Sequence, residues 1–384
     1  MNPREPSSSL PPESHPGRRA MLGGALAAGA AAFACRSASA RPAQAANEPP
    51  RRARKDYPVL VGSSNALAGM KLHYARLQEG ADPLDVAIEI LKVTEADPKD
   101  DSVGLGGLPN EEGVVQLDAA CMYGPRHKSG GVACIENILH PSEVARLVLE
   151  RTDHCLLVGR GAYDFARQHG HPHTELLTEA SRRKWLEWKE KLSPTDDRLP
   201  PPPAVPFEGS LPPRGVEVAA RPGRERRPTG TIHCSALGKS GAIACATSTS
   251  GLAWKIPGRV GDSAIVGSGL YCDQEAGSAG STGRGEACVL ANGSSAIVDL
   301  LRRGASPLDA GLEVLRRVVK QTQRQARYQP ELLNEKGLPS FDLQFYVLGL
   351  DGKTAGVRLS GSGTYAVSDP EKGPRHEPFV EFQG

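Results

Sequence analysis

The sequence from Gly230 to Gly285 decides the fold. It reads GTIHCSALGKSGAIACATSTSGLAWKIPGRVGDSAIVGSGLYCDQEAGSAGSTGRG. Its apolar, β-prone residues 231–237 and 242–247 predict two neighbouring strands. Three motifs of glycines and hydroxyl residues follow, namely TSTSG at 247–251, GRVGDS at 258–263 and GSAGSTGRG at 277–285. The segment is therefore predicted to be a strand pair that leads into glycine-rich stretches carrying polar groups.

Thr231 stands at the start of the first predicted strand, directly after Gly230. If the bond between them breaks, Thr231 gains a free α-amine beside its own hydroxyl. Such an amine has an intrinsic pKa of about 7.7–8.0, against about 10.4 for lysine, so near neutral pH it can accept the hydroxyl proton. Gly230 suits this bond because it tolerates strained backbone and lets the hydroxyl reach its carbonyl. A glycine–threonine pair alone is uninformative, so the prediction depends on the motifs that follow.

The GRVGDS motif places a cation and an anion three residues apart. Arg259 can fork onto a carboxylate and Asp262 can accept an ammonium group, so together they suit a zwitterionic substrate. A salt bridge within the loop is the alternative interpretation. The later motif, which contains Thr282 and Gly283, supplies the hydroxyls and backbone amides of an oxyanion hole. A phosphate cradle competes with that interpretation, but the GxGxxG spacing is incomplete and no GxxxxGK[ST] occurs.

Outside this stretch, the pattern predicts helices that cover antiparallel strands. Pro58–Val61 reads as a strand, and helices are expected over residues 66–78 and 83–96, the second capped by Asp82. The unit Gln78–Asp85 is echoed at residues 300–309, which suggests two related halves. Further strands are expected at 113–117, 131–133, 343–348 and 355–359, with a hairpin turn at Asp351-Gly352. We expect an α+β fold.

Two segments are expected to lie outside the fold. Residues 1–46 contain Arg18-Arg19, an apolar run and Ala-x-Ala sites, which is typical of a twin-arginine export signal and predicts a periplasmic or extracellular protein. Cys35 is a candidate for lipidation within that leader, with a poor match. Residues 191–230 are rich in proline and arginine and are expected to be an exposed connector. A connector of that length makes sense if its far end becomes a chain terminus.

Composition excludes several classes of function. The net charge is +2, so no long-range field favours nucleic acid or an anionic membrane surface. The arginines of the connector have no interleaved aromatic residues, which also argues against nucleic acid. The eight cysteines have neither CxxC nor zinc-ligand spacing and are expected to be mostly buried apolar residues, with disulfides an alternative in an exported protein. We expect no metal, no cofactor, and no membrane association once the signal is removed.

These motifs, taken in order, resemble the β-subunit start of glycosylasparaginases, which are members of the N-terminal-nucleophile asparaginase superfamily. Thr-Ile, Thr-Ser-Thr-x-Gly, Gly-Arg-Val-Gly-Asp-Ser and Thr-Gly-x-Gly all occur. The N-terminal half adds Asp101–Gly107, Leu117-Asp118-Ala119 and Leu156–Gly159. The resemblance covers residues 57–195 and 231–365.

The resemblance implies a four-layer αββα sandwich, self-cleavage into an α chain (47–230) and a β chain (231–384), and an (αβ)2 dimer. It implies that Thr231 is nucleophile and base and that Thr249 hydrogen-bonds it. Arg259 and Asp262 would bind the substrate's α-carboxylate and α-amine, while Thr282 and Gly283 would form the oxyanion hole, with Gly283 also touching the amine. Asp118 is interpreted as structural, turning a strand end.

Two departures from the family pattern leave alternatives open. Gly230 stands where glycosylasparaginases carry Asp, as in plant-type asparaginases and isoaspartyl peptidases. Asn65 replaces an early tryptophan that faces the substrate, which removes an aromatic platform for a glycan. The expected substrate is N4-glycosylated asparagine, and free asparagine or isoaspartyl dipeptides are the alternative. An uncleaved binding protein is disfavoured because Thr249, Arg259 and Asp262 are all present, and a dehydrogenase would need bound nicotinamide. The role of the tail after Val367 is left open.

Overall fold

A computed structural model describes residues 57–191 and 229–383 of the chain. The predicted export signal at 1–46, its Cys35 and most of the predicted connector lie outside the described residues. The connector's expected limits need correction at both ends. Lys191 is the last residue of a helix, and Thr229 and Gly230 already belong to a strand.

The larger of the two sheets holds eight strands in the order β12-β11-β1-β5-β6-β2-β3-β4, as described over these ranges. Neighbouring strands pair antiparallel, apart from β3 with β4. Its two central strands, β5 and β6, carry the start of the deciding sequence. The strands are β1 (Val59–Gly62), β2 (Gln116–Tyr123), β3 (Lys128–Glu136), β4 (Leu157–Val158), β5 (Thr229–Leu237), β6 (Ile243–Leu252), β11 (Thr364–Ser368) and β12 (Arg375–Pro378).

The smaller sheet has five strands in the order β13-β10-β9-β8-β7. Its middle strand, β9, pairs antiparallel with both neighbours, and β10 pairs parallel with the short β13. The strands are β7 (Leu270–Asp273), β8 (Gly277–Gly283), β9 (Leu343–Gly349), β10 (Thr354–Arg358) and β13 (Val380–Glu381).

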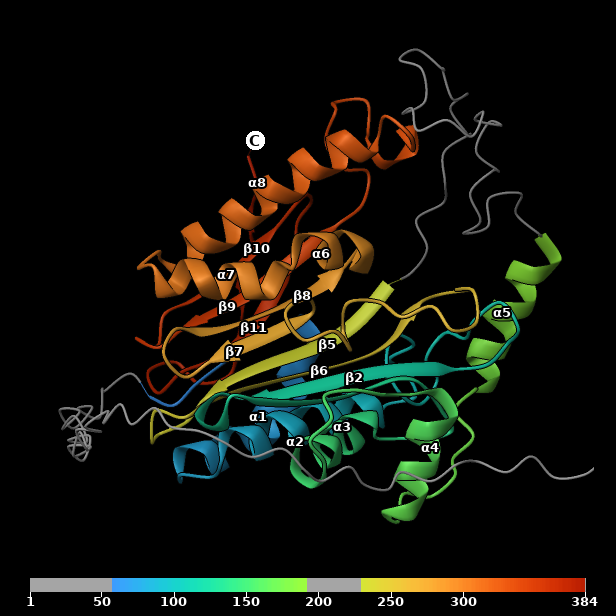
Figure 1. Ribbon diagram of the computed structural model, residues 1–384, viewed down its shortest axis with the longest axis horizontal. Helices are drawn as coiled ribbons and strands as arrows, with labels where there is room; N and C mark the ends of the chain where they lie inside the picture. Colours follow the sequence, from blue (N-terminus) through green and yellow to red (C-terminus); the bar gives the residue numbers. More distant parts are fainter. Residues whose placement is uncertain (1–56, 192–228, 384) are drawn as a thin grey trace, which may run out of the picture. The chain divides into compact units, whose positions relative to one another are not determined.

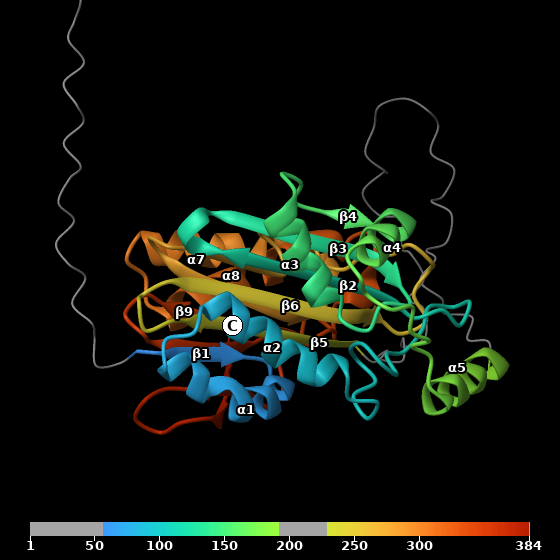
Figure 2. The ribbon, with the colours of Figure 1, turned by 90° about the horizontal axis from the view of Figure 1, so that it is seen from below.

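Helices cover the outer face of each sheet, as Figures 1 and 2 show. On the larger sheet, α1, α2 and α3 bury apolar side chains against β2, β3, β5 and β6. On the smaller sheet, α6, α7 and α8 pack against β8, β9 and β10. The helices are α1 (Leu67–Gln78), α2 (Pro83–Glu95), α3 (Pro141–Arg151), α4 (Gly159–Gln168), α5 (Glu179–Lys191), α6 (Gly285–Ala291), α7 (Gly293–Arg302) and α8 (Pro307–Gln325), with short 3-10 turns at Ser64–Ala66, Gly124–Arg126 and Pro330–Leu332.

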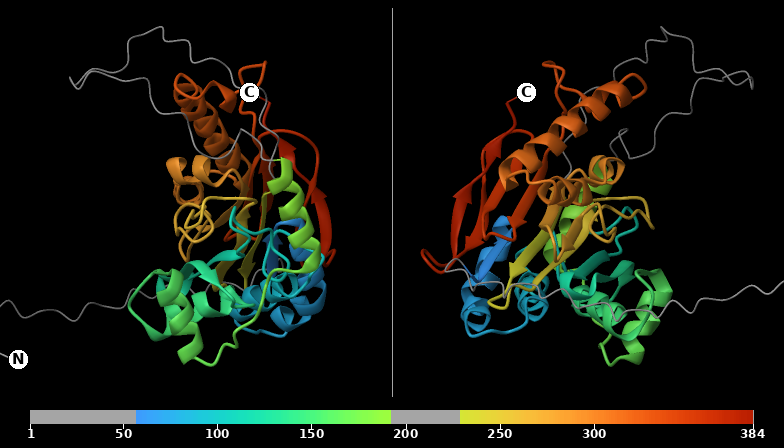
Figure 3. Two further views of the ribbon diagram at one scale, coloured as in Figure 1. Left: turned by 90° about the vertical axis from the view of Figure 1, so that its right-hand side faces the viewer. Right: turned by 60° about the vertical axis from the view of Figure 1, so that its left-hand side comes forward.

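The inner faces of the two sheets pack against each other. Met122 and Ile243 from the larger sheet form a third apolar cluster with Leu270, Tyr346 and Leu348 from the smaller sheet. Figure 3 shows the two groups of helices on opposite sides of the paired sheets. The core is therefore divided into two helix–sheet layers and one sheet–sheet layer, and residues 230–285 contribute strands to both sides of the sheet–sheet layer.

A small separate cluster gathers all three tryptophans of the chain. Trp185 and Trp188 come from α5 and Trp254 from the segment after β6. The rings of Trp188 and Trp254 are stacked with centroids 5.4 Å apart, and the Trp185 indole donates a hydrogen bond to the Glu111 carbonyl. This cluster fixes α5, the last described element before residues 192–228.

The structure confirms the α+β class and most of the expected elements. The two echoed units become α2 and α8, each with a capping side chain followed by proline, and each lies on a different sheet. The Asp351-Gly352 turn joins β9 to β10 as predicted. The tail after Val367 contributes β12 and β13. Five cysteines, at 121, 234, 245, 272 and 288, are buried and free, as expected, whereas Cys134 is half-buried and Cys155 exposed.

Two expectations were wrong in detail. The strand predicted at 113–117 starts only at Gln116, because Gly113 has a φ of 85° and its N–H closes a turn onto the Asn110 carbonyl. Asp118 was expected at a strand end but lies inside β2, at a bulge. There its carboxylate accepts the Cys134 N–H at 2.8 Å, which satisfies a donor that the bulge removes from the ladder.

Candidate active site

Thr231 lies near the start of β5, where the pairing with β6 is irregular. Gly230 is opposite Gly251, but Ile232 is already opposite Ser248, so Thr249 and Ser250 together face Thr231. A bulge of this kind re-aims side chains and is frequent beside active sites. Because the chain is continuous here, the bond predicted to break lies within a hydrogen-bonded strand and not in a loop.

Thr249 connects the Thr231 hydroxyl to the Gly230 carbonyl. The Thr231 hydroxyl donates to Thr249 Oγ1 at 3.1 Å. The Thr249 hydroxyl in turn donates a short hydrogen bond to the Gly230 carbonyl oxygen. Thr249 Oγ1 is held from behind by the Gly251 N–H at 2.8 Å. The three groups needed to attack and polarise the 230–231 peptide bond are therefore in direct contact.

Ser102 packs against the other side of Gly230. A Cβ added at Gly230 would lie 1.7 Å from Ser102 Cβ, so no larger residue fits without displacing this neighbour. The Ser102 hydroxyl donates to the Asp100 carboxylate, and the Asn65 amide donates to the same carboxylate at 3.1 Å. Asn65, which was expected to stand in place of a tryptophan, thus connects to Gly230 through the Asp100 and Ser102 side chains.

Arg259 is nearly buried and held by a glutamate that the sequence reasoning missed. Its Nε and Nη2 donate to Glu286 Oε1 at 3.0 and 2.8 Å, and Arg284 forms a second ion pair with Glu286 at 3.3 Å. Burial alone would raise the pKa of Glu286, but Arg259 and Arg284 outweigh it and hold that pKa below its usual value. Glu286 is therefore ionised and fixes the position of the Arg259 guanidinium.

Asp262 is the second charged group of the predicted substrate site. Its carboxylate is buried and accepts a short hydrogen bond from Ser281. Burial raises the pKa of Asp262, and the Ser281 hydroxyl and Arg259 counter part of that rise. Asp262 and Arg259 make no ion pair with each other in the described chain, contrary to a simple loop salt bridge, and the ion-pair partner of Arg259 is Glu286 instead.

Lys255 supports the loop that carries these charges. Its side chain is fully buried, and its ammonium donates to the backbone carbonyls of Gln116 and Ser250 at 2.9 and 3.1 Å. Burial lowers the pKa of Lys255, although Asp118 opposes that effect. Lys255 therefore ties the segment before Arg259 to both β2 and β6.

Thr282 and Gly283 end β8, the strand whose Gly280 packs directly against the His233 ring of β5. Gly283 has a φ of 116°, and a Cβ there would lie 2.5 Å from the Asp342 carbonyl, so glycine is required. The Thr282 hydroxyl is 2.7 Å from the Tyr346 hydroxyl. The two residues predicted to form the oxyanion hole thus lie at the end of a strand and not in a loop.

One cavity brings most of these residues together. It is lined by Thr231, Thr249, Arg259, Asp262 and Gly283, together with Gly251, Leu252, Gly261, Ser263 and Gly285. Its volume is about 10 Å³, which is room for about one water molecule. Thr282 is not among the lining residues. In the continuous chain, the site is assembled but too small to admit an amino acid.

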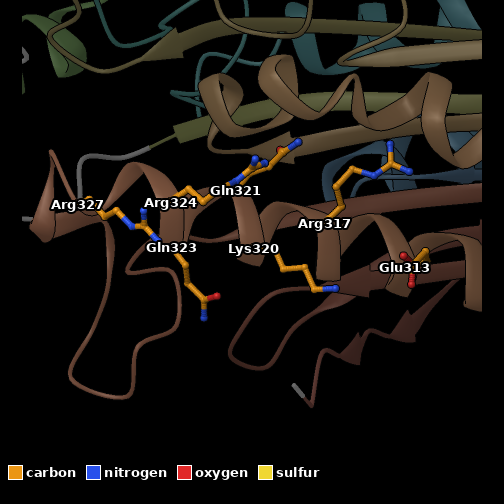
Figure 4. Close-up of a pocket in the computed structure, with 7 residues that line it drawn as sticks. All are labelled: Glu313, Arg317, Lys320, Gln321, Gln323, Arg324 and Arg327. Carbon is orange, nitrogen blue, oxygen red and sulfur yellow. The ribbon is translucent and has the colours of Figure 1, made fainter. Parts of the chain in front are cut away.

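A larger cavity, of about 550 Å³, lies elsewhere along α8. Figure 4 shows its lining side chains, which are Glu313, Arg317, Lys320, Gln321, Gln323, Arg324 and Arg327. None of the predicted site residues lines it. In the ranges that the structure describes, no group of three or more His, Cys, Asp or Glu side chains is placed to hold a metal, and no helix is long and apolar enough to span a bilayer.

Comparison with known proteins identifies the family. The model of the asparaginase family matches residues 63–326, well over half of the chain. This chain belongs to the asparaginase family. The match confirms the resemblance to N-terminal-nucleophile asparaginases and the expectation that the protein is a hydrolase.

Two branches of this family are among the relatives. An N(4)-(beta-N-acetylglucosaminyl)-L-asparaginase of Elizabethkingia miricola is 35% identical over 301 residues, covering 78% of this chain and 78% of its own. The enzyme of the same name from Mus musculus is 36% identical over 249 residues, covering 64% and 72%. An isoaspartyl peptidase/L-asparaginase of Xenopus laevis is 35% identical over 250 residues, covering 63% and 72%.

Several residues that complete the site were missed by the sequence reasoning. Glu286 directly follows the Thr-Gly-Arg-Gly motif, so an acidic residue next to a predicted site motif was a usable signal. Ser102 stands within the quoted Asp101–Gly107 motif, but nothing local indicates that it meets Gly230. Tyr346 carries no local signal, because only the packing of the two sheets brings it toward the site. Lys255 stands between the TSTSG and GRVGDS motifs, but nothing in the sequence indicates that its ammonium is buried against the Gln116 and Ser250 carbonyls.

Proposed function

We propose that this asparaginase-family protein cuts its own chain before Thr231 and then hydrolyses the side-chain amide of asparagine derivatives. The observation that carries the proposal is the contact of Thr231, Thr249 and the Gly230 carbonyl, in one cavity with Arg259 and Asp262. The names of relatives support amide hydrolysis of this kind.

Self-cleavage begins with attack of Thr231 Oγ1 on the Gly230 carbonyl carbon. Thr249 donates to the carbonyl oxygen and so stabilises the negative charge that develops there. The C–N bond then breaks, the proton of the Thr231 hydroxyl is transferred to the threonine nitrogen, and an ester joins Gly230 to Thr231 Oγ1. Water hydrolyses that ester to a Gly230 carboxylate and a free Thr231 with both amine and hydroxyl. The residues before 231 are then free to move away from Thr231, which opens space beside its new amine.

Substrate hydrolysis uses the new amine. The amine accepts the Thr231 hydroxyl proton as the oxygen attacks the substrate's side-chain amide carbon. Thr282 and Gly283 stabilise the oxyanion, the protonated amine passes its proton to the leaving nitrogen, and a β-aspartyl ester remains. Water then opens the ester and restores Thr231. Arg259 and Asp262 hold the α-carboxylate and α-ammonium, and this fixes the amide in front of the nucleophile.

The preferred substrate is N4-glycosylated asparagine. The glycosylasparaginase names of relatives that cover most of the chain support this choice. The second candidate, L-asparagine or an isoaspartyl dipeptide, is supported by Gly230 and by the polar Asn65–Asp100 pair, which offers no aromatic platform to a sugar. A panel of the three substrates distinguishes them by the product released, which is a glycosylamine, ammonia or an amino acid.

The proposal extends to architecture and location. The succession of helices, eight-stranded sheet, five-stranded sheet and helices supports a four-layer αββα sandwich of the N-terminal-nucleophile type. An (αβ)2 dimer of the cleaved chains and twin-arginine export of the precursor belong to the same proposal. Size-exclusion chromatography with light scattering tests the dimer, and fractionation of cells expressing wild type or an Arg18→Lys/Arg19→Lys variant tests the export.

The central experiment is a denaturing gel with mass spectrometry and N-terminal sequencing. Wild type should give two bands, and the shorter one should begin with Thr231. Thr231→Ala should give one uncut, inactive band, whereas Thr231→Ser, which keeps a hydroxyl, should still be cut. An uncut wild-type protein, or a fragment that begins elsewhere, would remove the proposed mechanism.

A further inference from the structure

The Thr282 hydroxyl carries one hydrogen, which can stabilise an oxyanion only if it points into the active site. Two other polar atoms compete for it. Thr282 Oγ1 lies 2.7 Å from the Tyr346 hydroxyl oxygen and 3.3 Å from Gln344 Oε1. Tyr346 and Gln344 Oε1 are themselves 3.0 Å apart. Two hydroxyl hydrogens therefore serve a triangle of three oxygens.

The orientation of the Gln344 amide is set from behind. Gln344 Nε2 donates to Asp342 at 2.8 Å, and Asp342 is paired with Arg358. The amide nitrogen is thus directed away, and Oε1 faces the two hydroxyls as an acceptor only. When Tyr346 donates to Gln344, its oxygen can accept the Thr282 hydrogen, which then points away from the substrate. When Tyr346 donates to Thr282 instead, the Thr282 hydrogen is free to point at the oxyanion.

Tyr346 is well fixed for this task. Its side chain is 1% exposed, and its ring stacks on the His233 ring with centroids 5.8 Å apart and planes 11° apart. Burial raises the pKa of Tyr346, so the phenol keeps the hydrogen that it must donate. A Cβ at Gly280 would lie 2.1 Å from the His233 ring, so that ring is wedged between the two sheets.

His233 also donates no hydrogen bond to the three oxygens of Thr282, Tyr346 and Gln344. Ser278 donates to the Tyr271 carbonyl, so Ser235 donates to Ser278 and accepts from His233 Nε2. The Nε2 atom therefore carries the ring hydrogen, and Nδ1 is an acceptor without a partner in the described chain.

We infer that Tyr346 is a positioning residue for the hydrolytic reaction. By donating its own hydrogen to Thr282 Oγ1, Tyr346 directs the Thr282 hydroxyl hydrogen away from Gln344 and toward the oxyanion. The inference rests on the proposed function, because it concerns the oxyanion that forms at Thr231. Tyr346 touches no reacting atom, and its whole effect passes through Thr282.

The first test is the Tyr346→Phe variant of the cleaved protein, assayed on the best amide substrate. The ring and its stack are kept and only the hydroxyl is lost. We expect kcat to fall about tenfold, less than the ~10²–10³ lost with a direct oxyanion donor, while KM stays unchanged because the contact matters in the transition state. Tyr365→Phe is the matched control. Tyr365 is buried in the same sheet–sheet cluster, and the variant should keep the wild-type kcat.

A double-mutant cycle separates positioning from a general packing effect. If Tyr346 acts through Thr282, combining Tyr346→Phe with Thr282→Val should cost no more than Thr282→Val alone. Gln344→Leu removes the competing acceptor and should keep or raise kcat. This variant decides the matter by itself if Tyr346→Phe fails to accumulate as folded protein.

The outcomes distinguish this inference from the proposed function. An active wild type whose Tyr346→Phe variant keeps its kcat, or whose losses add in the cycle, overturns the inference alone. A Gln344→Leu variant with a large fall in kcat also overturns it. A correctly folded wild type that hydrolyses none of the amides removes the proposed function and this inference with it.

Discussion

A single methyl group at position 230 would collide with Ser102, whose Cβ would lie 1.7 Å away. At the scale of residues, the predicted cleavage site thus depends on the absence of a side chain at Gly230 as well as on the hydroxyl of Thr231. Thr249, which joins the two, has no freedom of its own, because Gly251, Thr231 and the Gly230 carbonyl occupy its oxygen and its hydrogen.

Gly230→Ala should slow self-cleavage strongly, because the added methyl group displaces Ser102 or moves the carbonyl away from Thr249. Ser102→Gly in the same chain removes the obstacle and should restore part of the rate. The measurement is the time course of precursor loss on a denaturing gel. Equal rates for wild type and Gly230→Ala would contradict the steric account.

Arg259→Lys should raise KM about tenfold or more, with a smaller change in kcat. A lysine keeps the charge but loses the planar fork that holds Glu286 and a substrate carboxylate together. Steady-state kinetics of the cleaved variant provide the measurement. An unchanged KM would mean that the carboxylate binds elsewhere.

At the scale of elements, the repeated sequence unit corresponds to a repeated helix start in the structure. α2 and α8 start with the same device, a capping side chain and then proline, but the caps differ in what else they hold. Asp82 accepts both the Leu84 N–H at 2.8 Å and the Tyr123 hydroxyl at 2.7 Å. Ser306 accepts the Asp309 N–H at 3.2 Å and donates to the Asp309 carboxylate.

Ser306→Ala should therefore lower the free energy of unfolding by about 1 kcal/mol, the usual value of an N-cap. Asp82→Ala should cost more, because half-buried Tyr123 also loses its acceptor. Urea unfolding of the two variants on one background gives the comparison. A smaller loss for Asp82→Ala than for Ser306→Ala would contradict this ranking.

Local patterns predicted those elements that carry their own signals. Prolines and capping residues marked α2 and α8, and Asp351-Gly352 marked the β9–β10 turn. The motif residues Thr231, Thr249, Arg259, Asp262 and Gly283 were found because each stands in a short distinctive string, and the structure brings them to one cavity. Tyr346, Gln344 and Ser102 could not be found in this way, since strand pairing in the smaller sheet brings Tyr346 and Gln344 beside Thr282, and the packing of a distant turn brings Ser102 against Gly230.

At the scale of the whole molecule, the sheet–sheet layer encloses an uncharged histidine. Burial lowers the pKa of His233 to about 3, from an ordinary value of 6.5. His233 is therefore protonated below about pH 6.5 in the unfolded chain, but only below about pH 3 in the folded chain. Stability is at its full value above this window and falls as the pH is lowered through it.

His233→Phe should flatten this dependence, because it removes the titrating group and keeps a stacking ring. Each pH unit of the window is worth about 1.4 kcal/mol. Between pH 7 and about pH 5, wild type should therefore lose about 2 kcal/mol more than the variant. Urea unfolding at both pH values supplies the measurement, and identical losses would show that His233 is protonated in the folded protein.

All three tryptophans gather where α5 meets the segment after β6, so the intrinsic tryptophan fluorescence of the protein reports on this one contact. Trp185 and Trp188 stand on α5, just before residues 192–228, and Trp254 stands five residues before Arg259. All indole fluorescence therefore comes from this one cluster. Release of α5 after the backbone is severed would separate the stacked Trp188 and Trp254 rings and shift their emission to longer wavelength. Maturation can thus be followed in real time, without a label, by fluorescence from one known location.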